Sequence, residues 1–168
     1  MDSAQESDHR SNGKYLELSA RAHGTSVNEQ TLLATDYLNC INEICMLLEM
    51  LPDALDCFED CRNWRLLTYN EHFQQSHIAD AKLAMEAYPY SPPQSREAFE
   101  TIISNIGNII SSAIQMLEIP IAAGQITSIE AITKDAVQRL HDNIGILGAI
   151  INGQSPDQDT VDNLLQNF

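Results

Sequence analysis

Apolar residues return at helical spacing along three long segments of this chain, and this periodicity constrains the fold more than any other feature. In residues 26–51 they follow steps of four and three residues: Leu33, Tyr37, Cys40, Ile44, Leu47 and Leu51. Residues 92–118 and 128–152 repeat the pattern. Such a stripe is typical of an amphipathic helix, and almost no segment alternates with the period of two that strands require. The sequence therefore predicts an all-α protein.

Capping motifs predict where the helices begin. In a capping box, a Ser or Thr and a Glu or Gln three residues later satisfy free amide groups at a helix start. Five such pairs occur: Ser26 with Glu29, Thr68 with Glu71, Ser91 with Gln94, Thr127 with Glu130, and Ser155 with Gln158. The predicted helices cover residues 26–51, 53–61, 68–88, 92–118, 128–152 and 156–166. We expect a break near Ser76, an end at Pro120 and a glycine cap at Gly153.

These elements predict a single packed unit. Four long amphipathic helices joined by short connections favour an antiparallel four- to five-helix bundle. Residues 26–168 are expected to form this single helical-bundle domain, since 168 residues suit one domain. Residues 1–25 are polar, and we expect a flexible N-terminal arm with Tyr15 and Leu16 as anchors.

Charge excludes two classes of partner. Twenty-four acidic and nine basic residues leave a net charge of −15. Such a chain lacks the clustered cations that bind nucleic acid, and anionic lipid repels it. The most apolar window, residues 101–117, is interrupted by polar residues, and the first 25 residues hold no apolar run. We therefore expect no membrane span, no secretory signal and a cytoplasmic location.

The acidic residues are concentrated in one segment. Residues 29–60 contain eight Asp and Glu residues and no Lys or Arg. One interpretation is a solvated face that keeps the protein soluble. The alternatives are a docking surface for a basic protein partner and a cation site.

A metal site is a further hypothesis. His77 and Asp80 share one helix face at a spacing of three residues, and Glu43 could approach them across the bundle. The four cysteines, Cys40, Cys45, Cys57 and Cys61, lack the tight pairs of zinc knuckles. Because Cys40 and Cys45 lie within an apolar stripe, we expect reduced cysteines that pack in the core. The sequence predicts no cofactor.

One local string suggests phosphotransfer. Residues 140–153 read Leu-His-Asp-Asn-Ile-Gly-Ile-Leu-Gly-Ala-Ile-Ile-Asn-Gly. The string resembles the phosphoacceptor helix of histidine kinases and of their dimeric histidine phosphotransferase relatives. The resemblance implies a helical bundle in which His141 accepts a phosphoryl group. Asp142 would orient the imidazole or take its proton.

The sequence otherwise offers no catalytic machinery. It contains no Gly-rich phosphate loop, zinc-protease motif or nucleophile elbow. The last long helices are rich in isoleucine, and Ile146 and Ile150 lie off the main stripe of their helix. We therefore expect a non-enzymatic protein that acts through protein–protein contacts as a homodimer, with Ile110, Ile114, Ile146 and Ile150 at the interface. The alternatives are a histidine phosphotransfer-like protein and a metal-binding bundle.

Overall fold

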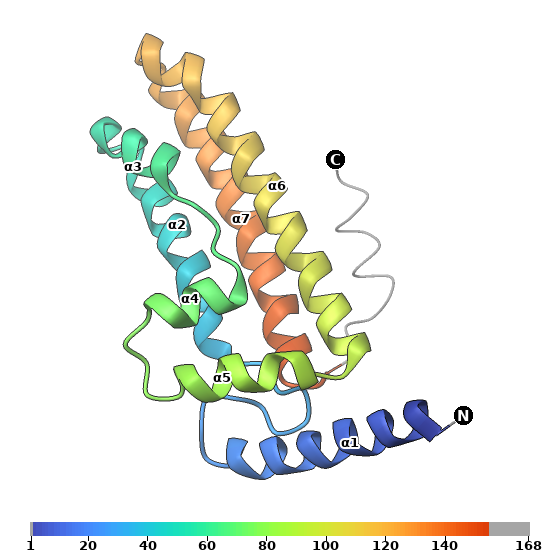
Figure 1. Ribbon diagram of the computed structural model, residues 1–168. Helices are drawn as coiled ribbons and strands as arrows, with labels where there is room; N and C mark the ends of the chain where they lie inside the picture. Colours follow the sequence, from blue (N-terminus) through green and yellow to red (C-terminus); the bar gives the residue numbers. More distant parts are fainter. Residues whose placement is uncertain (1, 155–168) are drawn as a thin grey trace.

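The fold is built from helices (Figure 1). The computed structural model describes residues 2–154, and of residues 2–10 it describes only the backbone. Within this range the only extended pairing is an isolated antiparallel bridge between Val27 and Ala34. The prediction of an all-α protein is confirmed. The helix predicted over residues 156–166 lies outside the described residues.

Seven α-helices occur within residues 2–154. They are α1 (Asp2–Ala22), α2 (Leu38–Met50), α3 (Phe58–Asn63), α4 (Tyr69–Gln75), α5 (Ala81–Ala87), α6 (Pro93–Ala123) and α7 (Ile126–Ile151). Three single 3-10 turns flank them: η1 (Thr35–Tyr37), η2 (Leu55–Cys57) and η3 (Tyr88–Tyr90).

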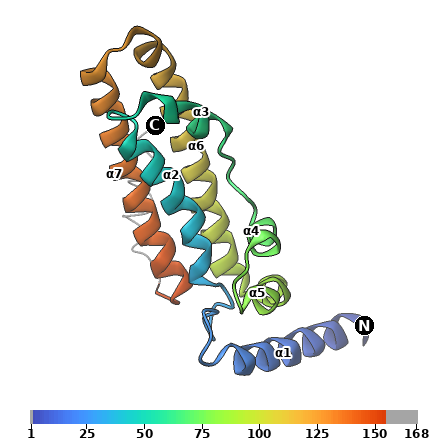
Figure 2. The same cartoon turned by 90° about the vertical axis from the view of Figure 1, so that its left-hand side faces the viewer.

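Three helices, α2, α6 and α7, lie side by side; α1, α4 and α5 lie at one end of this layer, and α3 lies near the other end (Figures 1 and 2). Helices α6 and α7 form a long antiparallel hairpin. Helix α2 runs antiparallel to α7, since Leu38 at its start lies beside Gly148 and Glu49 near its end shares a groove with His141. Helices α4 and α5 cross the base of this layer, and α1 lies beyond α5. The free tip of the α6–α7 hairpin extends past α2 and α3.

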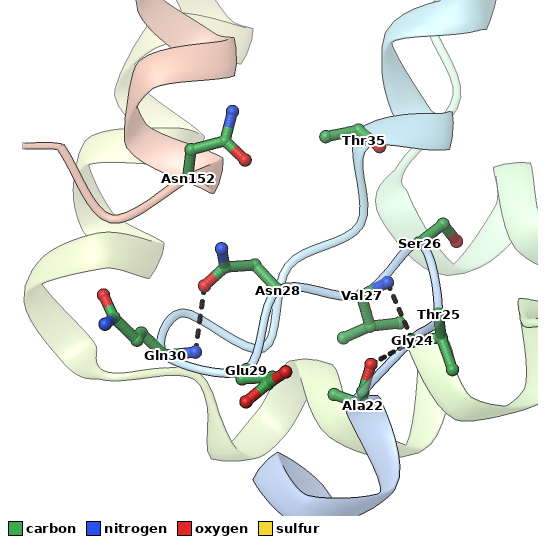
Figure 3. Close-up of a pocket in the computed structure, with 10 residues that line it drawn as sticks. All are labelled: Ala22, Gly24, Thr25, Ser26, Val27, Asn28, Glu29, Gln30, Thr35 and Asn152. Atoms are coloured by element: carbon green, nitrogen blue, oxygen red, sulfur yellow. Dashed lines mark hydrogen bonds between the residues drawn. The ribbon is translucent and has the colours of Figure 1, made fainter.

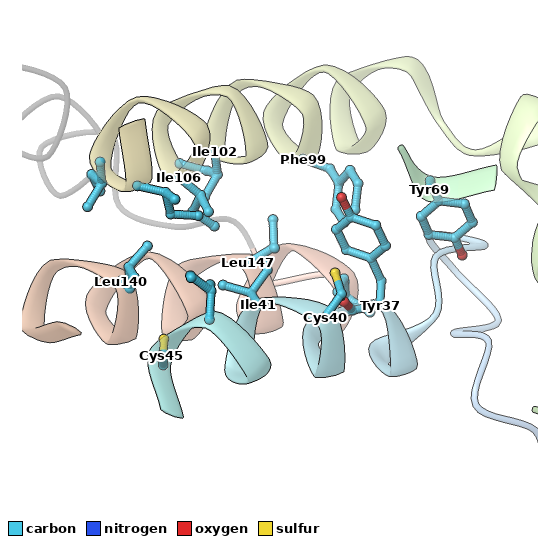
Figure 4. Packing of buried hydrophobic residues seen from close by; sticks show 14 of the residues in the cluster. Tyr37, Cys40, Ile41, Cys45, Tyr69, Phe99, Ile102, Ile106, Leu140 and Leu147 are labelled. Carbon is cyan, nitrogen blue, oxygen red and sulfur yellow. The ribbon is translucent and has the colours of Figure 1, made fainter. Parts of the chain in front are cut away.

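The core lies between the three long helices (Figure 4). Ile41 and Cys45 of α2 meet the buried faces of α6 and α7. Those faces carry the predicted stripe residues, including Ile102, Ile106, Leu140 and Leu147, each at most 1% exposed. Burying an aliphatic side chain of this size contributes roughly 1.5–3 kcal/mol relative to leaving it exposed.

An aromatic cluster fastens the base to this core. The rings of Tyr37 and Tyr69 stack with centroids 5.6 Å apart, and Phe99 of α6 lies 5.4 Å from Tyr37. The Tyr37 hydroxyl donates to the Leu67 carbonyl at 2.6 Å, and the Tyr69 hydroxyl accepts the Ala34 N–H at 2.8 Å. Burial raises the pKa of both phenols above the ordinary value. The hydrogen bonds join α4 to the segment before α2, and the ring contacts of Phe99 join both to α6.

The first long helix begins later than the sequence predicts. Its predicted start at Ser26 is wrong, because residues 26–34 form a loop and helical backbone begins with η1. The Ser26 N–H donates to Asp80 Oδ2 at 3.0 Å, and Glu29 Oε1 lies 2.7 Å from His23 Nδ1. Because the Ser26 N–H and the Glu29 carboxylate bond to these other residues, Ser26 and Glu29 do not form a capping box.

Of the four pairs within the described range, Thr68 and Glu71 form the capping box that the sequence predicts. The Thr68 N–H donates to Glu71 Oε2 at 2.9 Å, and the Glu71 N–H donates to the Thr68 hydroxyl at 3.3 Å. The predicted break is also confirmed, since α4 ends at Gln75 and Ser76 is its C-cap. The segment 68–88 therefore supplies two short helices across the base rather than a fourth long helix.

The end predicted at Pro120 is wrong, because α6 continues to Ala123. Proline so close to a helix end removes only one amide donor, and its carbonyl accepts the Gln125 N–H at 2.9 Å. Gly124, with a φ of 62°, closes α6 in the left-handed conformation. The predicted glycine cap of α7 is confirmed, since Gly153 has a φ of 75° and its N–H donates to the Ile150 carbonyl.

The segment predicted as a flexible arm contains helix α1. Its buried side chains include Leu18 and Ala22, and the Tyr15 hydroxyl donates to the Gln30 carbonyl at 2.8 Å. The Tyr15 anchor is confirmed, whereas Leu16 is wrong as an anchor because its side chain is 61% exposed. The residues that α1 packs against the core, Tyr15, Leu18 and Ala22, are separated by mostly polar residues. They form too narrow an apolar stripe to predict a packed helix from the sequence.

Candidate functional site

A groove between α2 and α7 contains the histidine that the sequence singles out. Its volume is about 520 Å³, and it lies between the end of α2 and the first half of α7. Glu49 and Asp53 line one side, and Glu130, Lys134 and His141 line the other. All three acidic side chains are exposed. The groove therefore combines an open mouth with an excess of negative charge.

His141 and Asp142 do not form the pair that phosphoryl transfer would use. Both are exposed on α7. The Asp142 carboxylate accepts a hydrogen bond from the Gln138 amide at 3.0 Å, one turn earlier on the same helix. No hydrogen bond joins His141 to Asp142 in the described part of the chain. His141 is accessible to a partner, but the carboxylate expected to orient it bonds elsewhere.

The predicted metal ligands do not meet. Glu43 Oε2 accepts the Trp64 indole N–H at 3.2 Å, and Asp80 Oδ2 accepts the Ser26 N–H. His77 is exposed in the connection between α4 and α5. Across residues 2–154, no group of three or more His, Cys, Asp or Glu side chains could hold a metal ion. Each of the two carboxylates therefore serves a separate structural contact.

The cysteines are free thiols, and three of them are buried. Burial raises the pKa of Cys40 to about 12 and the pKa values of Cys45 and Cys61 to about 11. Because the thiolate is the reactive form, these thiols are poor nucleophiles at neutral pH. The predicted packing of Cys40 and Cys45 in the core is confirmed.

The isoleucines predicted to form a dimer interface face the inside of the protein. Ile110, Ile146 and Ile150 are buried, with exposed fractions of 4%, 9% and 3%. Ile114 is half-buried and packs against the core. Within the chain, these side chains therefore offer little surface to a partner. The face of α7 that looked like a second surface is covered within the chain.

Among the described residues, three of the six exposed large apolar side chains lie at the tip of the α6–α7 hairpin, and the other three are Leu16 on α1 and Met46 and Met50 on α2. Met116 is 60% exposed, Ile119 76% and Ile126 41%. A shallow pocket of about 250 Å³ beside Met116 follows the α6–α7 seam, where Ala113, Ala131 and Ile132 also line it. Between Glu100 and Glu130 the sequence contains a single charged residue, Glu118. The scarcity of charge is the sequence feature that could have indicated an exposed apolar tip. The helical periodicity alone does not distinguish the tip from the buried part of the hairpin.

A polar pocket of about 460 Å³ lies beside the loop that joins α1 to α2 (Figure 3). Asn28 shapes this loop, because its side-chain oxygen accepts the Gln30 N–H at 2.9 Å and the Thr31 N–H at 3.0 Å. The opposite side is formed by Asn152 at the end of α7. The lining holds one charged side chain, Glu29, which lies 2.7 Å from His23 Nδ1. This pocket has the groups to bind a small polar molecule but no acid–base pair for catalysis.

Helix α6 is the one helix of the described range that is long and apolar enough to cross a membrane. One face of α6 is buried: Ile102 and Ile106 lie on the side that faces α7, and Phe99 packs against Tyr37. Core helices of soluble proteins share this length and composition, so the property is weak evidence and does not assign α6 to a membrane.

Comparison with protein-family models, with curated proteins and with solved structures finds no match for this chain. The geometry of the described residues is therefore the basis for inferring function.

Proposed function

We propose that this chain is a non-enzymatic protein-interaction module that self-associates through the tip of the α6–α7 hairpin. The observation that carries the proposal is the cluster of exposed apolar side chains there, Met116, Ile119 and Ile126. Apolar side chains left exposed at a free end are costly in water, and a second copy that covers them removes this cost.

Charge supports the same surface. A chain with a net charge of −15 repels its own copies, so a dimer needs a contact region with few charges. The hairpin tip meets this requirement, because Glu118 is the one charged residue between Glu100 and Glu130. The acidic residues 29–60 would remain in solvent in such a dimer.

The proposal retains the antiparallel bundle as the scaffold of a cytoplasmic protein. Helices α2, α6 and α7 would form its long members, and α4 and α5 would complete it at the base. The buried contacts of Tyr37 and Phe99 fix that base, which leaves the tip as the end available for a partner.

The test is the oligomeric state of matched variants. We expect the full chain to sediment as a dimer, and Met116→Glu or Ile119→Glu to raise the dimer dissociation constant at least about tenfold. Met46→Glu is the control, since Met46 on α2 is 57% exposed and Met116 is 60% exposed. A monomeric wild type at high concentration, or equal effects of Met46→Glu and Met116→Glu, would overturn the proposal.

The exposure of His141 favours a second candidate function, histidine phosphotransfer. Its test is incubation of the chain with phosphorylated response regulators. Labelling that is lost in His141→Ala and kept in His77→Ala would support this role, since both imidazoles are exposed. Equal labelling of the two variants would refute it.

A further inference from the structure

The α2–α7 groove carries three acidic side chains without cationic partners. Among the described residues, Glu49, Asp53 and Glu130 form no ion pair, whereas Glu17 and Glu86 both contact Lys14 at 3.0 Å. Lys134 is the only cation that lines the groove. Acidic side chains on opposite sides of one groove give it a negative potential that extends into its mouth.

Apolar side chains accompany these acids. Met46 lies one turn before Glu49 and Met50 directly follows it, so both adjoin this groove residue on the exposed side of α2, although neither lines the groove itself. Their side chains are 57% and 53% exposed. Val137 and Pro52 line the groove itself. Exposed methionines are flexible and polarizable, so they adapt to different apolar side chains at binding surfaces.

The length of the groove sets the size of its occupant. Its α7 side runs from Glu130 to His141, and eleven residues of helix rise about 16 Å. That length matches about three turns of a partner helix. A helix in such a groove presents apolar side chains on one face and charged side chains along its edges.

We infer that the α2–α7 groove binds a basic amphipathic helix of a partner protein. Lys or Arg side chains of that helix would meet Glu49, Asp53 and Glu130, and its apolar face would cover Met46, Met50 and Val137. A second copy of this chain is a poor occupant, because its net charge is also negative. The inference deepens the proposed function by naming a partner class, and it uses side chains other than those of the hairpin tip.

The probe is a labelled synthetic helix of Leu and Lys, about four turns long, with an amphipathic arrangement. Its control is a peptide of the same composition in a scrambled order that has no apolar face. Fluorescence anisotropy with the full chain should show binding of the amphipathic peptide that weakens as salt is added. The scrambled peptide should bind at least about fivefold more weakly.

A matched pair of variants tests the position of the site. Replacing two groove acids, Glu49→Gln with Glu130→Gln, should weaken binding at least about fivefold. Replacing two exposed acids on α6, Glu97→Gln with Glu118→Gln, changes the net charge equally and should alter binding less than about twofold. Equal losses from both pairs would show attraction by net charge alone and would overturn the inference.

Methionine methyl signals give an independent readout, since the chain has five methionines. The peptide should shift the NMR signals of Met46 and Met50 and leave those of Met85 and Met116 in place. Shifts confined to Met116 would place the peptide on the hairpin tip and overturn the inference. A monomeric chain that still shifts Met46 and Met50 would refute self-association while supporting the groove, so the two failures are distinguishable.

Discussion

The two ends of the α6–α7 hairpin share one sequence pattern and have opposite surroundings. At the base, Phe99 is 2% exposed and packs against the rings of Tyr37 and Tyr69. At the tip, Ile119 is 76% exposed. Helix α2 ends at Met50, and the hairpin continues beyond it (Figure 1). The difference shows that apolar residues are structural where another helix reaches them and are available for contacts where none does.

The largest expected difference between the base and the tip of the hairpin comes from truncating one side chain at each end. Phe99→Ala should lower the free energy of unfolding by about 3–5 kcal/mol, because it leaves a cavity within the aromatic cluster. Ile119→Ala should change it by less than about 0.5 kcal/mol. Urea unfolding monitored by circular dichroism measures both, at a concentration where the oligomeric state is the same. Similar losses at the two ends would contradict the contrast.

A buried polar pair between the two ends should have the next largest effect. Asn105 and Asn143 are at most 3% exposed, and the Asn105 amide donates to Asn143 Oδ1 at 2.9 Å. Asn143→Leu should cost about 1–3 kcal/mol, because it leaves the Asn105 amide buried without an acceptor.

The double variant Asn105→Leu with Asn143→Leu should recover most of that loss, since no unpaired amide remains. Equilibrium unfolding of both single variants and the double variant completes the cycle. If the two single losses simply add in the double variant, the pair does not act as a unit.

Two glycines, one at the hairpin tip and one inside α7, should give smaller stability changes of opposite sign when they are replaced by alanine. Gly124 at the tip has a φ of 62°, so Gly124→Ala should cost about 1 kcal/mol. Gly145, inside α7, has open space where a Cβ would lie, so Gly145→Ala should stabilise the helix by about 0.5–1 kcal/mol. Thermal unfolding should give shifts of opposite sign, and shifts of the same sign would contradict this interpretation.

The smallest effect is expected where α1 meets the base. The Arg21 guanidinium and the Lys14 ammonium lower the pKa of Glu86 from 4.5 to about 2. A lowered carboxyl pKa stabilises the fold above pH 4.5, and this contribution disappears as the pH falls from 4.5 towards 2. Arg21 and Glu86 are exposed and Lys14 is half-buried, so solvent screening keeps the effect small.

In Glu86→Gln, the urea midpoint should therefore depend less on pH between 4.5 and 2 than it does in the wild type. Glu97→Gln is the control, because Glu97 is exposed and forms no ion pair within the described residues. Equal slopes for wild type and Glu86→Gln would show that these ion pairs do not stabilise the packing of α1.

Much of the helical content could be predicted, because local signals specify it. The break at Ser76 and the cap at Gly153 depend on the residues at those positions, and both are confirmed. The start predicted at Ser26 is wrong because a distant carboxylate, Asp80, takes its N–H. A pattern within one segment does not contain that competitor.

The candidate surfaces were harder to predict for a related reason. Ile146 and Ile150 lie off the main stripe of α7, and the sequence interpretation assigned them to a dimer. The structure buries both. A broad apolar face indicates that something covers it, but the covering element here is another part of the same chain. Met116 and Ile119 continue the apolar composition of α6 and lie where nothing in the described range covers them.

By itself, the sequence determined that the chain is helical, where several helices end and that its charge is concentrated near one helix. These properties follow from local propensity, caps and composition, which act over a few residues. Only the tertiary structure decided that α1 packs as a helix, that Glu43, His77 and Asp80 stay apart, and that the hairpin tip is exposed. Those outcomes depend on which distant segments meet, because the length and direction of each helix fix what it can cover.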